Sequence, residues 1–170
     1  MLPIVFNPKS LRVGLAGLGE SFAHRRALLV EAGVRPAAIF EDSLPSPGEI
    51  AGFNLLFVAG LDETVSGALA KSARAAGVLV NVEDRPALCD FHVPALIRRG
   101  DLLLTISTGG RSPALAKALR EDIERRFGTE WDSRLVEIAV LRETLRSEGV
   151  DPGEVSERTR ALIQGKGWLD

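Results

Sequence analysis

The fold is decided by the stretch Leu11-Arg-Val-Gly-Leu-Ala-Gly-Leu-Gly-Glu-Ser-Phe22. Its first half is a short apolar run that ends at Gly17, which is typical of a buried strand. From Glu20 to Ala32, apolar residues recur at the spacing of a helix, and Gly33 follows as a stop signal. We therefore predict a strand, a tight turn that contains two glycines and a helix over these residues.

The same alternation of strand and helix continues outward to about residue 85. Apolar runs, turn residues and caps predict strands at 37–40, 54–59 and 78–82, a loop at 43–48 and a helix from Asp62 to Ala76. In chain order the elements read strand, helix, strand, strand, helix, strand. This order is typical of a parallel sheet covered by helices, so we predict a Rossmann-type domain.

The pattern changes after Pro86. Two strand-like runs, 91–98 and 102–108, are joined by a tight turn and predict a β-hairpin. Helices are then predicted at 113–127, 131–148 and 155–164, the first with Ser112 as its cap and Pro113 at its first position. The predicted fold class is therefore α/β, with a Rossmann-type parallel sheet, a small β-hairpin module and a helical C-terminal region.

Composition narrows the class of protein. The 170 residues include 21 Lys and Arg against 23 Asp and Glu, so the net charge of −2 gives no electrostatic case for a nucleic-acid partner. No apolar run is long enough to span a bilayer, and the N-terminus lacks the pattern of a signal peptide. The single cysteine, Cys89, excludes an intrachain disulfide and a multi-thiolate metal site. We expect a cytoplasmic protein that binds neither nucleic acid nor membrane.

The turn Gly17-Leu-Gly19 is a candidate pyrophosphate site. Glycines allow close backbone approach, and the following helix offers free N–H groups and the positive end of its dipole. The third position of the dinucleotide fingerprint is the bulky Phe22, which should push the helix off the sheet unless Ala23 takes that place in a longer turn. Asp42, 20 residues after Phe22, stands where an acid for the ribose hydroxyls is expected. We favour a dinucleotide site over a tight turn that binds nothing.

Polar residues follow two further apolar runs, in Asn81-Val-Glu-Asp84 and in Ser107-Thr-Gly-Gly-Arg-Ser112. Ligands gather at the carboxyl ends of strands in open parallel sheets, so these stretches indicate an enzyme site. Asp84 has an alternative role as a cap of its turn. The second stretch suits a carboxylate or phosphate, and equally suits an ordinary helix-capping loop. Cys89 is interpreted as a small buried hydrophobic residue.

Several motifs together resemble the precorrin-2 dehydrogenase family, the N-terminal modules of siroheme synthases. They are Asn81-Val-Glu-Asp84, Cys89-Asp-Phe-His-Val-Pro-Ala95, Ser107-Thr-Gly-Gly-Arg-Ser-Pro-Ala-Leu-Ala116 and Leu119-Arg-Glu121, with Leu2-Pro-Ile4 and Ala23-His-Arg-Arg26 as further matches. The resemblance covers most of the chain to about residue 125. It implies an NAD-binding domain at 1–85, a hairpin dimerisation module at 86–112, a helical region at 113–170 and a homodimer.

The resemblance also implies an activity, the NAD-dependent oxidation of the tetrapyrrole precorrin-2 to sirohydrochlorin, with ferrochelatase activity in some members. Asp84 is the implied catalytic residue, and no residue is assigned to a metal. Motifs and resemblance together predict cofactor binding by Gly17, Gly19, Glu20, Ser21, Asp42, Gly60, Leu61, Asp62, Asn81 and Val82. They predict substrate binding by Ser107, Thr108, Gly109, Gly110, Arg111 and Ser112, with Arg98 and Arg99 as further partners for substrate carboxylates.

The chain departs from the family pattern around the dinucleotide. The family has three consecutive glycines where this chain reads Ala16-Gly-Leu-Gly19, and an Ala-Ala-Thr-Asp motif where it reads Ala59-Gly-Leu-Asp62. The segment between the second and third predicted strands is also shorter than in the family. Two alternatives therefore stay open: a sirohydrochlorin chelatase without dehydrogenase activity, and a non-catalytic tetrapyrrole-binding homologue.

Overall fold

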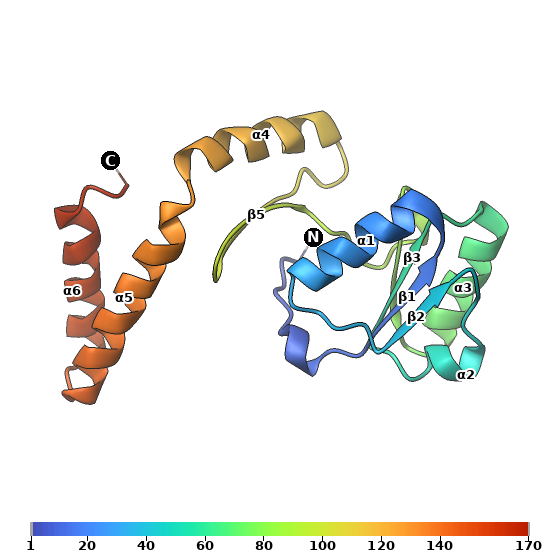
Figure 1. The fold of residues 1–170 in the computed structure, drawn as a ribbon, viewed down its shortest axis with the longest axis horizontal. Coiled ribbons are helices and arrows are strands. Elements are labelled where there is room, and N and C mark those ends of the chain that lie inside the picture. The colour runs from blue at the N-terminus through green and yellow to red at the C-terminus, as the bar shows by residue number, and fades with distance from the viewer. Residues whose placement is uncertain (1, 170) are drawn as a thin grey trace. The chain divides into compact units, whose positions relative to one another are not determined.

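The computed structural model describes residues 2–169, which form two compact units divided between Val93 and Pro94. In Figure 1 the first unit carries the labels α1 to α3 and β1 to β3, and the second carries β5 and α4 to α6. Among the described residues, no helix combines the length and the apolar character needed to cross a membrane.

The first unit is built on a four-stranded parallel sheet. Its strands, in spatial order, are β2 (Ala38–Glu41), β1 (Val13–Gly17), β3 (Leu55–Ala59) and β4 (Leu79–Val82). The long helices are α1 (Gly19–Glu31) and α3 (Glu63–Ala75), and short helical turns lie at Pro8–Ser10 and Pro86–Leu88. Every residue of β1 and β3 is buried, as expected for central strands of a sheet that is covered on both faces.

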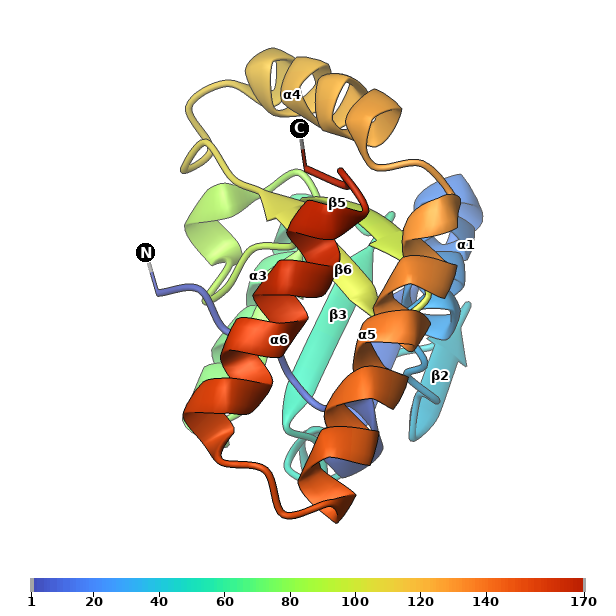
Figure 2. The same cartoon turned by 90° about the vertical axis from the view of Figure 1, so that its left-hand side faces the viewer.

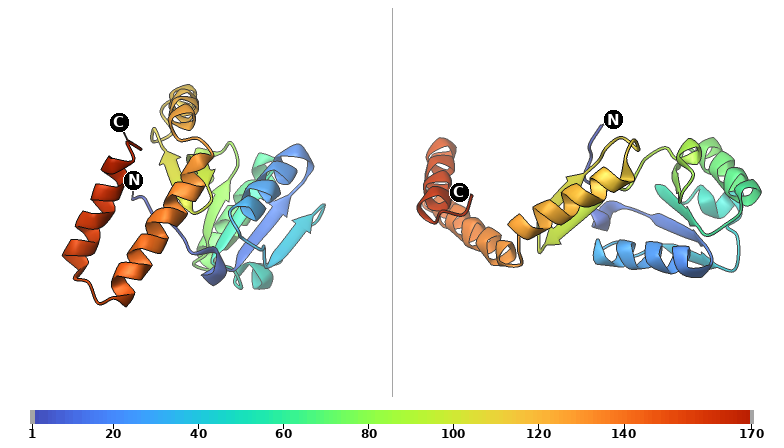
Figure 3. Two further views of the ribbon diagram at one scale, coloured as in Figure 1. Left: turned by 60° about the vertical axis from the view of Figure 1, so that its left-hand side comes forward. Right: turned by 90° about the horizontal axis from the view of Figure 1, so that it is seen from above.

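Two apolar cores lie on opposite faces of this sheet. Alternate residues of β3 divide between them, because successive side chains of a strand point to opposite faces. Leu55 and Phe57 pack with Phe22 and Leu29 of α1. Leu56 and Val58 pack with Leu69, Ala70 and Ala73 of α3. Helices α1 and α3 therefore cover the two faces, as Figure 3 shows.

The segment predicted as a loop at 43–48 instead leads into a short helix, α2 (Pro47–Ile50). The Ser46 hydroxyl accepts a hydrogen bond from the Glu49 amide at 3.3 Å, and the Glu49 carboxylate accepts from the Ser46 amide at 2.7 Å. Hydrogen bonds from the Ser46 hydroxyl and, second, from its amide lower the pKa of Glu49. The Ser-x-x-Glu spacing is a capping-box signal that the prediction overlooked.

The free edge of β4 is closed by the segment that follows it. The Asp90 amide donates to the Val80 carbonyl at 2.8 Å, and the Asp90 carboxylate accepts from the Val80 amide at 3.0 Å. Arg74 of α3 donates to the same carboxylate at 2.8 Å. Side-chain and main-chain groups thus satisfy an edge strand that would otherwise expose its ladder.

The second unit joins a β-hairpin to three helices. Strands β5 (Ala95–Arg99) and β6 (Leu102–Ile106) are antiparallel, and the helices are α4 (Pro113–Arg126), α5 (Glu130–Ser147) and α6 (Pro152–Gly165). Figure 2 shows α5 beside α6. The Arg134 guanidinium lies 5.0 Å from the Trp131 ring and 5.4 Å from the Trp168 ring, which ties the end of the chain to α5.

The predicted fold class is confirmed, and the largest shifts in element boundaries are at the start of the hairpin and the start of the last helix. The hairpin begins at Ala95 rather than Phe91, because the Phe91 ring packs edge-on against Phe57 of the first unit with centroids 5.4 Å apart. The last helix begins at Pro152 rather than at residue 155, because the Asp151 carboxylate accepts from the Gly153 amide at 2.8 Å.

Candidate functional site

Contact between the turn after β1 and the turn after β3 explains why Gly17 and Gly60 are glycines. Gly17 ends β1 with φ 154°, and a Cβ on it would overlap the Ala59 carbonyl oxygen. Gly60 has φ 72°, and a Cβ on it would overlap the Leu18 carbonyl oxygen. The Leu18 amide donates to the Ala59 carbonyl at 3.2 Å. The turns after β1 and β3 therefore touch through their backbones, and each needs a glycine at the contact.

Gly19 is different, because a Cβ added there would meet no atom of the described residues within 4 Å. Its φ is 69°, and it opens α1, whose N-cap Leu18 makes no side-chain hydrogen bond to the helix. The neighbouring Glu20 is exposed and Ser21 half-buried. The start of α1 thus has free space beside Gly19 and no capping side chain, an arrangement that suits an anion.

Phe22 fills the space between α1 and the sheet. Its side chain is 1% exposed and belongs to the core that includes Val13 and Leu15. Ala23, by contrast, is exposed. The suggestion that Ala23 takes the third fingerprint position is therefore wrong, since the aromatic ring itself makes the contact between helix and sheet.

Asp42 and Asp84 share an uncommon backbone conformation. They are the only non-glycine residues between 2 and 169 with positive φ, at 58° and 56°. Asp42 follows β2, and its amide lies 3.4 Å from the Gly17 carbonyl, beside the glycine turn. Asp84 follows β4, and both carboxylates lie on exposed residues. Because the strands are parallel, the two residues lie at one edge of the sheet, and strained backbone of this kind clusters at functional sites.

The turn at Asp84 is closed without its side chain. The Arg85 amide donates to the Val82 carbonyl at 3.3 Å, whereas the Asp84 carboxylate accepts no hydrogen bond from the described residues. The turn-capping alternative therefore lacks the contact that defines it. The neighbouring Glu83 is held by Arg25 of α1 at 3.6 Å, a contact that the sequence did not indicate.

Asn81 presents a buried amide on β4. The residue is 6% exposed, and its Nδ2 donates to the Phe91 carbonyl at 2.9 Å, which fixes the orientation of the amide. Its Oδ1 is buried and has no hydrogen-bond partner in the part of the chain that the structure describes. A buried oxygen without a donor is costly, so this atom is suited to accept from a ligand.

The predicted residues after β3 have contacts of their own. The Asp62 carboxylate caps α3 by accepting from the Val65 amide at 2.9 Å. Leu61 is half-buried against the core on the α3 side. The buried Ser66 hydroxyl donates to the Leu61 carbonyl at 3.4 Å. The cap gives Asp62 a structural role in starting α3.

The predicted substrate loop, residues 107–112, belongs to the second unit and is organised by three hydroxyls. The Ser107 hydroxyl accepts from the Gly109 amide at 3.3 Å. Thr108 Oγ1 accepts from the Ser112 amide at 3.2 Å, and the Ser112 hydroxyl caps α4 by accepting from the Leu115 amide at 3.2 Å. Gly109 and Gly110 have φ values of 68° and 76°. Arg111 is exposed. The loop is therefore a helix cap that carries an exposed guanidinium.

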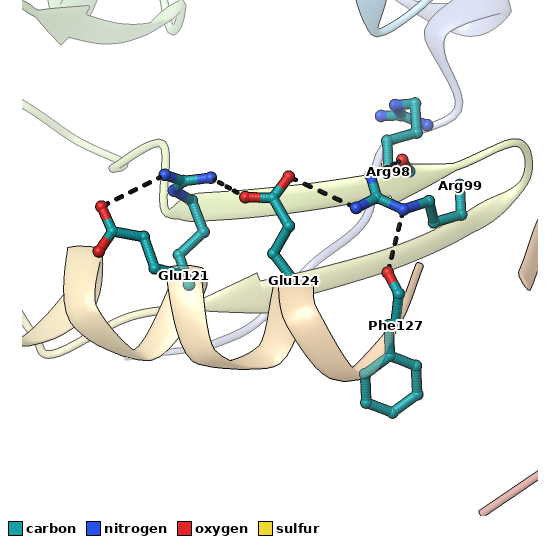
Figure 4. A network of polar contacts seen from close by, with 6 residues as sticks. Arg98, Arg99, Glu121, Glu124 and Phe127 are labelled. Atoms are coloured by element: carbon teal, nitrogen blue, oxygen red, sulfur yellow. Dashed lines mark hydrogen bonds and ion pairs between the residues drawn. The ribbon is translucent and has the colours of Figure 1, made fainter. Parts of the chain in front are cut away.

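The Arg99 guanidinium makes all its polar contacts within the second unit (Figure 4). Its guanidinium donates to the Phe127 carbonyl at 3.0 Å and the Arg98 carbonyl at 2.9 Å, and lies 3.4 Å from the Glu124 carboxylate. Its side chain is 16% exposed. The expectation that Arg99 binds substrate carboxylates is not supported, because Nε and Nη2 contact the end of α4 and Nη1 donates to the Arg98 carbonyl within β5.

Residues 2–169 contain no cluster of three or more His, Cys, Asp and Glu side chains placed to hold a metal ion. The groups at the carboxyl edge of the sheet include the start of α1, the Asp42 and Asp84 carboxylates and the buried Asn81 amide oxygen. These groups fit a dinucleotide, because they can receive a pyrophosphate, ribose hydroxyls and an amide or hydroxyl donor.

Comparison with known proteins agrees with this geometry. Residues 4–95 match a family described as putative NAD(P)-binding, and residues 99–126 match one described as sirohaem biosynthesis protein central. The siroheme synthase of Methylococcus capsulatus is 36% identical over 173 residues, which cover 89% of this chain and 36% of that protein. The siroheme synthase of Azotobacter vinelandii is 36% identical over 141 residues, 72% of this chain and 30% of its own.

The chain thus spans about a third of the length of these curated relatives. A solved structure titled "SirC, precorrin-2 dehydrogenase" superposes with a TM-score of 0.77 at 18% identity and covers 100% of this chain and 93% of its own, which shows a shared fold. The family predicted from the sequence motifs is confirmed. This chain belongs to the family of siroheme synthase N-terminal modules and precorrin-2 dehydrogenases, with a putative NAD(P)-binding domain.

Proposed function

We propose that this protein oxidises precorrin-2 to sirohydrochlorin with NAD⁺ in siroheme biosynthesis. The observation that carries the proposal is the open start of α1 at Gly19, next to Asp42 at the same edge of the sheet. The unpartnered Asn81 oxygen supports it from β4. Family membership supplies the tetrapyrrole substrate class.

The residues have distinct roles in this proposal. NAD⁺, when bound, supplies the hydride acceptor. The first N–H groups of α1 hold the pyrophosphate, and Asp42 accepts hydrogen bonds from the ribose hydroxyls. A 2′-phosphate would meet the Asp42 charge, so NAD⁺ is preferred to NADP⁺. Asn81 Oδ1 accepts a hydrogen bond from the cofactor and orients it.

Asp84 completes the chemistry. Oxidation of precorrin-2 removes a hydride and a proton, and the proton needs an acceptor on the protein. The Asp84 carboxylate, exposed and free of hydrogen bonds from the described residues, accepts the proton. Separately, the loop 107–112 of the second unit offers the exposed Arg111, and a guanidinium pairs well with the carboxylates of a tetrapyrrole.

Titration with NAD⁺ tests the proposal most directly. We expect calorimetry to show binding that weakens by about tenfold or more in Gly19→Val, because a branched side chain would occupy the space that the pyrophosphate needs. Gly77→Val is the matched control. Gly77 has φ 73° and open space around it, but it precedes β4 and so lies at the opposite edge of the sheet.

Three outcomes separate the alternatives. Loss of affinity in Gly19→Val with NAD⁺ binding retained in Gly77→Val supports the dehydrogenase. Equal loss in both variants would mean that backbone strain, not the pyrophosphate space, is responsible. If no heat appears at millimolar NAD⁺, the dehydrogenase proposal fails. The alternatives, a chelatase without dehydrogenase activity or a non-catalytic tetrapyrrole-binding homologue, then replace it.

We also propose a homodimer. Within residues 2–169 the hairpin β5–β6 pairs only with itself, so both of its edges stay open, and two-stranded sheets are rarely stable alone. Val136 and Val140 of α5 are 57% and 60% exposed, one helical turn apart. Light scattering at micromolar concentration should give twice the 18.2 kDa mass of the chain. A uniform 18.2 kDa species would contradict the proposal.

A further inference from the structure

The Cys89 thiol touches both ends of the turn that carries Asp84. The Val82 amide donates to Sγ at 3.2 Å, and Sγ lies 3.1 Å from the Val82 carbonyl oxygen and 3.4 Å from that of Arg85. The S–H can donate to either carbonyl. Because Val82 and Arg85 flank Glu83 and Asp84, one side chain bridges the base of the turn.

Cys89 is itself held firmly in place. Its amide donates to the Pro86 carbonyl at 3.1 Å. The next residue, Asp90, pairs with Val80 through both its amide and its carboxylate, which fixes this segment along β4. The Asn81 amide nitrogen lies 3.6 Å from Sγ. The thiol is therefore a fixed point against which the turn is placed.

Asp84 has few contacts of its own, although Glu83 and Arg85 on either side of it pair with Arg25 and Glu63. It has a left-handed φ of 56°, its carboxylate accepts no hydrogen bond from residues 2–169, and one main-chain hydrogen bond of 3.3 Å closes the turn. Unfavourable backbone conformations persist only where contacts with the surrounding structure hold them in place. The contacts on either side of Asp84 must supply that restraint.

We propose that Cys89 is a positioning residue for Asp84. Its thiol holds the turn from Val82 to Arg85 so that the carboxylate stands at the carboxyl edge of the sheet. The inference rests on the proposed function, in which Asp84 accepts the proton. Positioning of Asp84 is a role beyond that of the small buried hydrophobic residue that the sequence suggested for Cys89.

Kinetics of five proteins test the inference: the wild type, Cys89→Ala, Cys89→Ser, Asp84→Asn, and Cys89→Ala combined with Asp84→Asn. We expect Cys89→Ala to lower kcat by about tenfold, because displacement of a reacting group by a fraction of an ångström is costly, with KM for NAD⁺ little changed. Cys89→Ser restores a donor and an acceptor and should recover part of the loss. With Asp84 already replaced, Cys89→Ala should cost little more, because it acts through that residue.

Amide hydrogen exchange gives a second measurement that needs no substrate. Cys89→Ala should speed exchange at Val82 and Arg85 and leave the amides of β1 unchanged. Unchanged exchange at the turn, or an equal loss of kcat with and without Asp84, would overturn the inference. Failure of the proposed function is distinct, because it appears as an inactive wild-type protein, and the exchange result still decides whether Cys89 holds the turn.

Discussion

Asp84→Asn should lower kcat for the oxidation of precorrin-2 by about 100-fold or more, the lower end of what a positioned acid or base contributes. The amide cannot accept the proton, whereas the backbone is preserved because Asn tolerates the left-handed φ of 56° at this position. Stopped-flow or steady-state absorbance of NADH would report the rate.

Asp42→Asn is the matched comparison, because Asp42 has nearly the same φ, 58°, at the end of another strand of the same sheet. It should raise KM for NAD⁺ and change kcat much less, since its proposed role is to bind the ribose. An unchanged kcat in Asp84→Asn would remove the proton-accepting role and leave Asp84 as an ordinary turn residue.

Gly17→Ala should cost roughly 3 to 5 kcal/mol in the free energy of unfolding, from steric overlap and backbone strain together. The new Cβ would overlap the Ala59 carbonyl oxygen, which is part of a fully buried strand and cannot move aside. Urea denaturation followed by circular dichroism would measure the change.

Gly19→Ala is the control within the same turn. Its Cβ meets nothing within 4 Å, so only the left-handed φ of 69° is penalised, at about 1 to 2 kcal/mol. If both variants lose the same free energy, contact between the turns after β1 and β3 is not what requires glycine at position 17.

The strands and long helices could be predicted because they depend on local signals. Apolar runs placed β1, β3 and β4, and glycine stops and Asp or Ser caps placed α1, α3 and α4. The start of the hairpin could not be predicted. Phe91 reads as a strand residue by its alternation with His92 and Val93, yet its position is set by contact with Phe57, far away in the sequence.

In the candidate site, too, some residues could be predicted from local sequence signals and others could not. Asp42 was selected for its distance from the glycine turn, and Asp84 for its place after an apolar run and for the resemblance to the family. Their functional roles stay predictions. The thiol contacts of Cys89 and the ion pair between Arg25 and Glu83 have no periodic signature, since they depend on how distant segments are brought together. Arg99 shows the opposite error, because a charged residue near a polar loop need not be free to bind a ligand.

The two glycines of the first turn are subject to different evolutionary constraints. Gly17 is required by the contact with Ala59 in any descendant that keeps the sheet, whereas no atom of residues 2–169 fills the space beside Gly19. A lineage that abandons the dinucleotide is free to drift at position 19 toward Asn or Asp, which accept a left-handed backbone. Retention of Gly17 with loss of Gly19 should therefore mark, in sequence comparisons, relatives that have stopped using the cofactor.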